Sequence, residues 1–127
     1  MAKKWIIYNH MVVETRDTAH IDGVFHALSD PTRRDILKHS LATELSVSAL
    51  ARRYPMSFAA VQKHVVVLER ARLVTKRRNG REQLVRGNVD VVASVVTLLD
   101  EFETVWRDRI TRIEQILTND EDKGEEK

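Results

Sequence analysis

The chain has no cysteine among its 127 residues. Disulfide bonds, thiolate metal sites and a cysteine nucleophile are therefore excluded, and the composition fits a reducing cytoplasm. No apolar stretch approaches the roughly 20 residues that a membrane-spanning helix needs. The apolar run after the basic start, "MAKKWIIY", is too short for a signal peptide. We therefore expect a cytoplasmic protein that does not enter a membrane.

Catalytic motifs are missing as well. The chain has four glycines, none of them in a phosphate-binding loop, and it has no zincin motif. His39 and Ser40 are sequence neighbours, which do not face each other on a helix. The three histidines nearest the N-terminus have a spacing that fits no metal site: His10, His20 and His26. We predict that the protein is not an enzyme and holds neither cofactor nor metal.

Positive charge is concentrated in one part of the chain. Residues 47–86 contain ten lysines and arginines against two glutamates, a formal charge of +8, although the whole chain carries only +2. The remainder of the chain is therefore acidic, at −6. Such segregation is typical of a segment that meets a polyanion such as nucleic acid. The alternative is a solvated charged face with no partner.

Apolar spacing and capping residues predict four short helices. Asp30 and Ser57 are good N-caps, Pro31 fits a first helical position, and Pro55 cannot continue the preceding helix. The third and fourth helices, joined by a short turn, form a helix-turn-helix. The expected ranges are 18–28, 31–40, 47–53 and 58–71.

A β-hairpin follows these helices. Asn79–Gly80 is the dipeptide that a two-residue type I′ turn favours, because both positions need positive φ. Such a turn sets Arg78 opposite Arg81 and Arg77 opposite Glu82. The hairpin tip is then basic, while its apolar base packs on the helices. A basic hairpin directly after a helix-turn-helix is a wing, so the predicted fold is a mainly α winged helix-turn-helix with a small β-hairpin.

A long C-terminal helix is expected over 90–118, capped by Asn88 or Asp90. It would be on the order of 40 Å long, whereas a domain of this size is roughly 30–35 Å across. Its apolar stripe therefore most simply packs on a second copy of the chain, although the helix could instead fold back on its own domain. The stripe comprises Val92, Val96, Leu99, Phe102, Trp106, Ile110, Ile113 and Leu117.

The domain organisation follows from these elements. The winged helix-turn-helix domain spans 18–118 and includes the dimerisation helix. Residues 1–17 show no clear period and could form a short strand or an arm. Residues 119–127, "NDEDKGEEK", are expected to be an acidic disordered tail.

Several segments, taken together, resemble the ArsR-type winged helix-turn-helix repressors. They are "LSDPTRRDIL" (28–37), "ELSVSALARRYPMSFAAVQKHVVVLERARLV" (44–74) and the "NGR" of the wing (79–81). The C-terminal helix with "RDRITRIEQIL" resembles a metal-free branch of that family. The resemblance implies a homodimer that binds an inverted repeat in DNA, usually to repress transcription.

The chain departs from the family at a few positions. Arg72 stands where the family commonly has glycine, at a place that often needs positive φ, which costs arginine roughly 1 kcal/mol. Gln62 stands where the family often has serine, so the DNA sequence that is read can differ. Metal-sensing relatives carry Cys-x-Cys in the third helix or Asp/His sets in the last one. Here the third helix has no cysteine and the last has no histidine.

The outward face of the fourth helix is the predicted DNA-reading surface, since the major groove admits one α-helix. Ser57 and the free N–H groups beside it can hold a phosphate. Gln62 can pair with an adenine edge, and Lys63 can reach guanine or phosphate. Phe58 and Ala59 could touch thymine methyl groups, although Phe58 fits a staple against the third helix equally well. Plain solvation is the alternative for Gln62 and Lys63.

The wing supplies the remaining cations. Lys76, Arg77, Arg78 and Arg81 are expected along the sugar-phosphate backbone or in the minor groove, where contacts give affinity rather than sequence preference. We expect His64 to be a packed histidine bonded to backbone rather than a base contact.

Arg33 and Arg34 could bind phosphates as well. They could equally be surface partners of Asp30 and Asp35, which is the interpretation we favour.

The sequence therefore predicts a homodimeric regulator that binds double-stranded DNA, with the dimer formed through Leu99, Phe102, Trp106, Ile110 and Ile113. The competing function is a dimeric protein-interaction module that keeps the fold without binding DNA. The concentrated charge of residues 47–86 favours DNA. The operator, the effector and the sign of regulation are not encoded in any motif of the chain.

Overall fold

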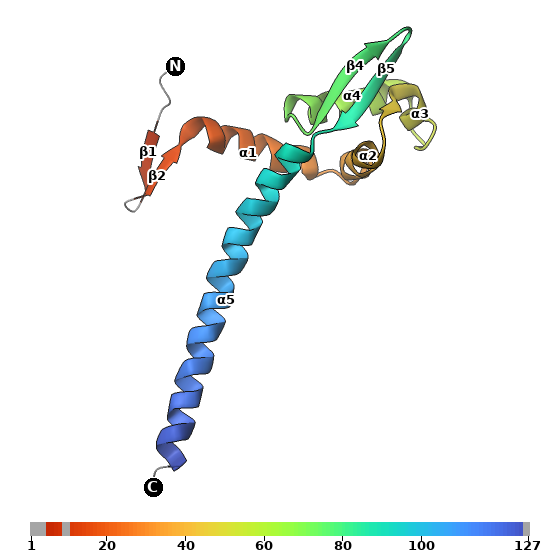
Figure 1. Cartoon of the computed structure of the whole chain (residues 1–127). Helices are drawn as coiled ribbons and strands as arrows, with labels where there is room; N and C mark the ends of the chain where they lie inside the picture. Colours follow the sequence, from red (N-terminus) through yellow and green to blue (C-terminus); the bar gives the residue numbers. More distant parts are fainter. Residues whose placement is uncertain (1–4, 9–10, 126–127) are drawn as a thin grey trace. The chain divides into compact units, whose positions relative to one another are not determined.

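The computed structural model describes residues 5–8 and 11–125, with side-chain environments over residues 20–121. Its contacts divide the chain into two compact units, Met1–Val92 and Ala93–Lys127, and each is described by itself. The fold is mainly helical, with a small three-stranded antiparallel sheet and a long C-terminal helix (Figure 1). This is the winged helix-turn-helix class that the sequence predicts.

The first described elements are two antiparallel strands, β1 (Trp5–Tyr8) and β2 (Met11–Glu14). Within the segment 1–17 that the sequence left open between a strand and an arm, residues 5–8 and 11–14 are strands and residues 15–17 already belong to α1. Residues 1–4 and 9–10 lie outside the described residues. α1 (Thr15–Leu28) follows β2 directly and begins earlier than the expected residue 18.

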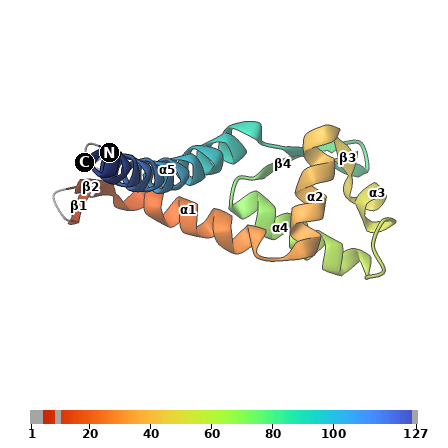
Figure 2. The same cartoon turned by 90° about the horizontal axis from the view of Figure 1, so that it is seen from below.

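Three further helices complete the helical part of the first unit: α2 (Pro31–Ala42), α3 (Val47–Ala51) and α4 (Phe58–Arg70). α2 runs crosswise to α1 (Figure 2). The predicted caps are confirmed, because the side chain of Asp30 accepts from the N–H of Arg33 and that of Ser57 from the N–H of Ala60. α3 ends before the expected residue 53.

The core of the first unit is apolar and draws on all of its larger elements. Each Val, Leu or Ile that is fully buried contributes about 1.5–3 kcal/mol to folding. α4 faces this core with Val61, Val65 and Leu68, which are all 0% exposed. The fully buried side chains include Val24, Ile36, Leu50, Val61, Val65, Leu68, Leu73 and Val85.

The wing consists of β4 (Val74–Asn79) and β5 (Glu82–Gly87), and the short β3 (Leu45–Ser46) pairs with the other side of β5. The predicted hairpin is present, but its predicted register is wrong: the turn lies one residue further along the chain, so each pairing partner differs by two residues. Asn79 pairs with Glu82, so the two loop residues are Gly80 and Arg81.

The reason for the shifted register lies in the backbone of the turn. Gly80 has φ +63°, and among the described residues outside glycine only Arg72 has positive φ. A two-residue turn whose first position alone has positive φ is of type II′, which needs glycine there and not Asn-Gly. Arg77 consequently pairs with Leu84 instead of Glu82. Because the partners shift by two residues, the same side chains share each face of the wing, and only the directly opposed pairs change.

α4 ends in a Schellman motif at Arg72. The N–H of Arg72 bonds to the carbonyl of Glu69, and the N–H of Leu73 bonds to that of Leu68. This motif requires a left-handed residue at its turning point, and Arg72 supplies it with φ +62°. The sequence prediction that arginine stands at a glycine-favouring position is confirmed.

α5 (Val89–Glu125) is a single helix of 37 residues, capped by Asn88, whose side chain accepts from the N–H of Asp90. It continues beyond the expected end near residue 118. Residues 119–125 are therefore helical, and the predicted disordered tail is wrong for that segment. Glu and Lys favour helices and no proline interrupts the run, so the acidic composition does not end the helix. Across the described residues, no helix is both long and apolar enough to cross a bilayer.

We expect Arg72→Gly to stabilise the protein. Glycine removes the cost of the left-handed conformation, which is roughly 1 kcal/mol, and loses part of that gain to the greater freedom of the unfolded chain. The free energy of unfolding should therefore rise by up to about 1 kcal/mol in urea denaturation. Arg72→Ala is the matched control, since it removes the charge but keeps the Cβ. An equal gain for both variants would exclude backbone strain as the cause.

Candidate nucleic-acid interface

The outward face of α4 carries exposed polar side chains above a fixed inner face. Val61, Val65 and Leu68 are fully buried, while Gln62 and Lys63, which lie between them in sequence, are exposed. The helix therefore cannot rotate to hide its polar side without exposing its apolar one. The two predicted reading residues share one open surface groove, which is lined by Ala59, Gln62, Lys63, Val66, Val67 and Arg70.

The first turn of α4 is exposed as well. Ser57 uses its Oγ to accept from the N–H of Ala60 at 3.1 Å, so the hydroxyl serves as the helix cap. Phe58 is 49% exposed, and Ala59 is exposed beside it. About half of Phe58 is therefore exposed and half is covered, so its burial does not decide between a thymine contact and a staple against α3.

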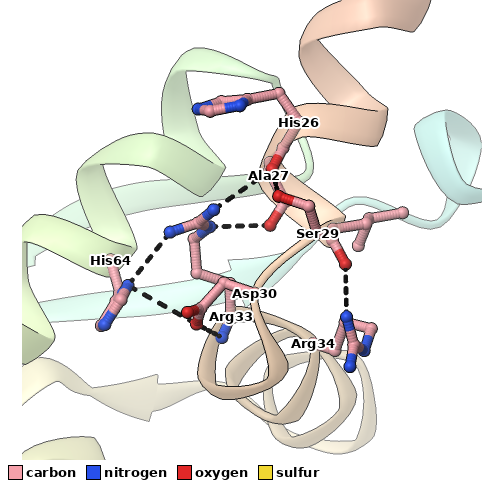
Figure 3. A network of polar contacts seen from close by, with 8 residues as sticks. His26, Ala27, Ser29, Asp30, Arg33, Arg34 and His64 are labelled. Atoms are coloured by element: carbon pink, nitrogen blue, oxygen red, sulfur yellow. Dashed lines mark hydrogen bonds and ion pairs between the residues drawn. The ribbon is translucent and has the colours of Figure 1, made fainter.

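Arg33 fixes the end of α1 and contacts α4 (Figure 3). Its Nε donates to the carbonyl of Ala27 at 2.7 Å and its Nη2 to that of His26 at 3.1 Å. Its Nη1 lies 3.4 Å from Nδ1 of His64. One guanidinium group in the first turn of α2 therefore satisfies carbonyls at the C-terminus of α1 and meets a side chain of α4.

Arg33 and Arg34 also have a structural role that the sequence did not indicate. Arg34 Nη1 donates to the carbonyl of Leu28 at 2.8 Å, so both arginines cap the C-terminus of α1. Cations are favourable at that end of a helix. The expected partnership with Asp30 is confirmed for Arg33, whose backbone N–H donates to Oδ2 of Asp30 and whose charge helps to lower the pKa of that carboxyl. Among the described residues, neither arginine forms a side-chain ion pair with Asp30 or Asp35.

His64 is packed, as predicted, but its partners are side chains instead of backbone. Its side chain is 23% exposed, and Nδ1 lies 3.8 Å from Oδ2 of Asp30 as well as near Arg33. The hydrogen bond from the N–H of Arg33 lowers the pKa of Asp30, and the charge of His64 adds to that effect. His64 thus joins α4 to the start of α2 instead of facing outward with Lys63.

A second polar contact holds α2 against the turn before α4. Tyr54 Oη donates to Oδ2 of Asp35 at 2.6 Å. This bond lowers the pKa of Asp35, while burial and the bond together raise the pKa of Tyr54. Carboxylates with a lowered pKa stabilise the fold above their ordinary pKa, and that contribution is lost as the pH falls through the lowered value.

The four predicted wing cations differ in their partners. Arg77 is bound by Glu44, with Nε to Oε2 at 3.0 Å and Nη2 to Oε1 at 2.7 Å. Lys76 Nζ lies 3.3 Å from Oε1 of Glu69. By contrast, within the part of the chain that the structure describes, neither Arg78 nor Arg81 forms an ion pair. Of these four cations, the structure therefore leaves only Arg78 and Arg81, at the tip of the hairpin (residues 78–81), without an ion pair among the described residues.

Sequence reasoning did not identify Glu44 and Glu69 as members of this region. Glu44 lies 33 residues before Arg77, and no local pattern connects the two. The hydrogen bond from Arg77 lowers the pKa of Glu44 and raises that of Arg77. A prediction of the antiparallel pairing of β3 with β5 could have indicated that the two side chains approach each other.

The second unit, taken by itself, presents an apolar stripe on α5. Leu99 is 49% exposed, Phe102 61%, Trp106 57%, Ile110 37% and Ile113 48%. Arg109 lies with its guanidinium carbon 6.0 Å from the centroid of the Trp106 ring, and Arg107 Nε donates to Glu103 at 2.6 Å. Five large apolar side chains exposed along one helix face typically mark an interaction surface.

Metal binding has no support in the described residues, where no three His, Asp or Glu side chains gather in a way that could hold an ion. His10 lies outside the described residues. The chemistry of the first unit is therefore that of hydrogen-bond donors and cations on a convex helix and hairpin, which suits a polyanion with a groove.

Residues 28–77 match the helix-turn-helix domain family. The chain is similar to the HTH-type transcriptional regulator Rv2034 of Mycobacterium tuberculosis, with 35% identity over 101 residues that cover 80% of this chain and 92% of that protein. It is also similar to the transcriptional repressor SdpR of Bacillus subtilis, with 30% identity over 61 residues that cover 48% of this chain and 68% of that protein.

The solved structures that resemble this chain also include ArsR-type regulators. An ArsR-like transcriptional regulator from Rhodococcus sp. RHA1 aligns with a TM-score of 0.68 and 33% identity, covering 80% of this chain and 96% of that one. The homodimeric winged helix-turn-helix DNA-binding domain of Mb0332 from Mycobacterium bovis, a possible ArsR-family regulator, aligns with a TM-score of 0.58 and 25% identity. That alignment covers 68% of this chain and 82% of that one.

Arg33→Ala should destabilise the first unit, because it leaves the carbonyls of His26 and Ala27 without their charged donor. Hydrogen bonds to charged groups contribute about 1.5–3 kcal/mol, so we expect a loss of that order in the free energy of unfolding. Arg34→Ala, which removes one such bond at a more exposed site, is the matched control and should cost less. Urea denaturation with an unchanged m-value is the measurement. Equal losses would contradict the bridging role of Arg33.

Proposed function

The chain belongs to the ArsR family of winged helix-turn-helix transcriptional regulators, and on that premise we propose that it represses transcription as a homodimer bound to an inverted repeat in double-stranded DNA. The observation that carries the proposal is the outward face of α4. Its hydrogen-bonding side chains are exposed while its opposite face is fixed in the core. Such a protein acts where the chromosome is, in the cytoplasm.

α4 enters the major groove with its N-terminal turn toward the DNA. Gln62 makes paired hydrogen bonds to an adenine edge, and Lys63 reaches guanine or a phosphate. The free N–H groups at the start of the helix, beside Ser57, donate hydrogen bonds to a phosphate, which the positive end of the helix dipole also attracts. The exposed half of Phe58 and the methyl group of Ala59 lie against thymine methyls.

The wing adds contacts that do not depend on sequence. Arg78 and Arg81 at its tip reach the sugar-phosphate backbone or the minor groove. Their contribution is to affinity and register, because phosphates are the same in every sequence. The formal charge of +8 on residues 47–86 supports a DNA partner over a protein one, since a protein adaptor has no need of it.

The dimer forms through the apolar stripe of α5, with Trp106 at its centre. Burying these side chains against a second copy removes them from water, worth about 25 cal/mol for each Å² of apolar surface. A two-fold dimer presents two identical reading helices in opposite directions, and such a pair fits an inverted repeat. The homodimeric Mb0332 domain supports the dimer, and the repressor SdpR supports the sign of regulation.

Gln62→Ala should relax the preference for one base pair in each half-site. The preferred duplex is first selected from random sequences, and binding to single base-pair variants is then measured by competition. Loss of the paired hydrogen bonds costs about 1–3 kcal/mol at the base pair that is read. Gln115→Ala, an exposed glutamine on α5, is the control. If no duplex were bound in a salt-dependent way, the protein-interaction module would be the better proposal.

Trp106→Glu combined with Ile110→Glu should give a monomer, because four carboxylates would enter the apolar contact between two copies. Light scattering measures the mass directly. The control, Thr104→Glu with Gln115→Glu, adds the same charge on the side of the helix away from the stripe. A Trp106/Ile110 variant that keeps the mass of the dimer would move the interface elsewhere. A wild-type chain that is monomeric would leave the stripe to fold against its own domain.

A further inference from the structure

The cations of the wing form two classes. Lys76 and Arg77 are paired with carboxylates of other elements, at 3.3 Å and 2.7 Å. Arg78 donates to the carbonyl of Gly80 at 3.3 Å within its own turn, and Arg81 is exposed. Lys76 and Arg77 are therefore neutralised within the protein, whereas Arg78 and Arg81 at the tip are not. Arg86, on the other strand of the wing, is exposed and near enough to Glu44 to help lower the pKa of that carboxylate.

The pair of Arg77 and Glu44 spans the three-stranded sheet. Arg77 on β4 pairs with Leu84 on β5, and Leu84 pairs with Ser46 on β3, so the three lie in one row. Glu44 precedes Ser46 by two residues and so shares its face, because side chains alternate along a strand. Both oxygens of Glu44 accept from the guanidinium fork. This two-point geometry holds the two outer strands together across β5.

The pair of Lys76 and Glu69 acts on the opposite face of β4. Lys76 adjoins Arg77 in sequence and so points the other way, toward Glu69 near the end of α4. The Lys76 side chain is only 17% exposed, so its methylene stem is packed and its ammonium has little freedom to leave. The two ion pairs thus hold β4 on both of its faces. Lys76 is paired with Glu69 of α4, and Arg77 is paired with Glu44, the residue just before β3.

We propose that Lys76 and Arg77 are positioning residues that set the pose of the wing, and that, of the four predicted wing cations, only Arg78 and Arg81 supply phosphate contacts. This inference rests on the proposed DNA binding. It revises the expectation from sequence, in which all four cations touch DNA. A phosphate contact by Arg77 would have to break two hydrogen bonds to Glu44 and leave that carboxylate unpaired beside a polyanion.

Replacing the two glutamates by glutamine tests the proposal, because a purely electrostatic role and a positioning role predict opposite changes in DNA affinity. If Glu44 and Glu69 act on DNA only through their negative charge, Glu44→Gln and Glu69→Gln tighten binding. If they hold the wing, both variants weaken binding, by about two- to fivefold, as expected for the loss of one surface ion pair. Glu82→Gln removes a carboxylate of the wing that is unpaired within the described residues, and it should leave binding unchanged or tighter.

The salt dependence gives the second readout. Each lost phosphate contact lowers the slope of log affinity against log salt by about 0.9. Arg78→Ala and Arg81→Ala should show that decrease, whereas Arg77→Gln should weaken binding with the slope unchanged. The double variant Glu44→Gln/Arg77→Gln should bind no more weakly than Arg77→Gln alone, because both changes remove one interaction.

Two results overturn the inference while leaving the proposed function intact. One is that Glu44→Gln and Glu69→Gln bind the selected duplex at least as tightly as Glu82→Gln. The other is that Arg77→Gln lowers the salt slope as much as Arg81→Ala. Absence of salt-dependent binding by the wild-type chain overturns the proposed function itself. Thermal unfolding of each variant confirms that the folded protein is being compared.

Discussion

The burial of one face of α4 is the constraint on which the rest of the first unit depends. Val61, Val65 and Leu68 have no exposed surface, so the orientation of the helix about its axis is set by the core. The side chains of Gln62 and Lys63 then face outward, because the helix places them away from its buried face. Polar contacts connect α4 and the turn before it to neighbouring elements. His64 contacts Arg33 and Asp30, Glu69 contacts Lys76, and Tyr54, in the turn before α4, donates to Asp35.

Much of this arrangement could be predicted from local sequence. The caps at Asp30 and Ser57, the apolar spacing in α4 and the positive φ at Arg72 each depend on a few neighbouring residues, and the structure confirms them. The hairpin was predicted but with the wrong register, because Asn-Gly and Gly-Arg both suit a two-residue turn and local sequence does not decide which pair occupies the loop. The end of α5 was missed because acidic composition resembles that of a disordered tail.

The contacts that the sequence did not indicate join residues far apart in the chain. Arg33 reaches carbonyls of the preceding helix and a histidine 31 positions away, and Arg77 reaches a glutamate 33 positions away. No periodicity encodes such pairs, since they depend on how whole elements pack. Composition could assign positive charge to the wing, but it could not separate cations that are already neutralised from those that are free.

Asn88 joins the end of α4 to the start of α5. Its N–H bonds to the carbonyl of Leu73 at 2.8 Å and its side-chain amide to that of Arg72 at 3.1 Å, while its Oδ1 caps α5. The first turn of α5 is consequently hydrogen-bonded, through Asn88, to the turn in which α4 ends. In the proposed function, the dimer helix and the reading helix are therefore connected through the hydrogen bonds of this one asparagine.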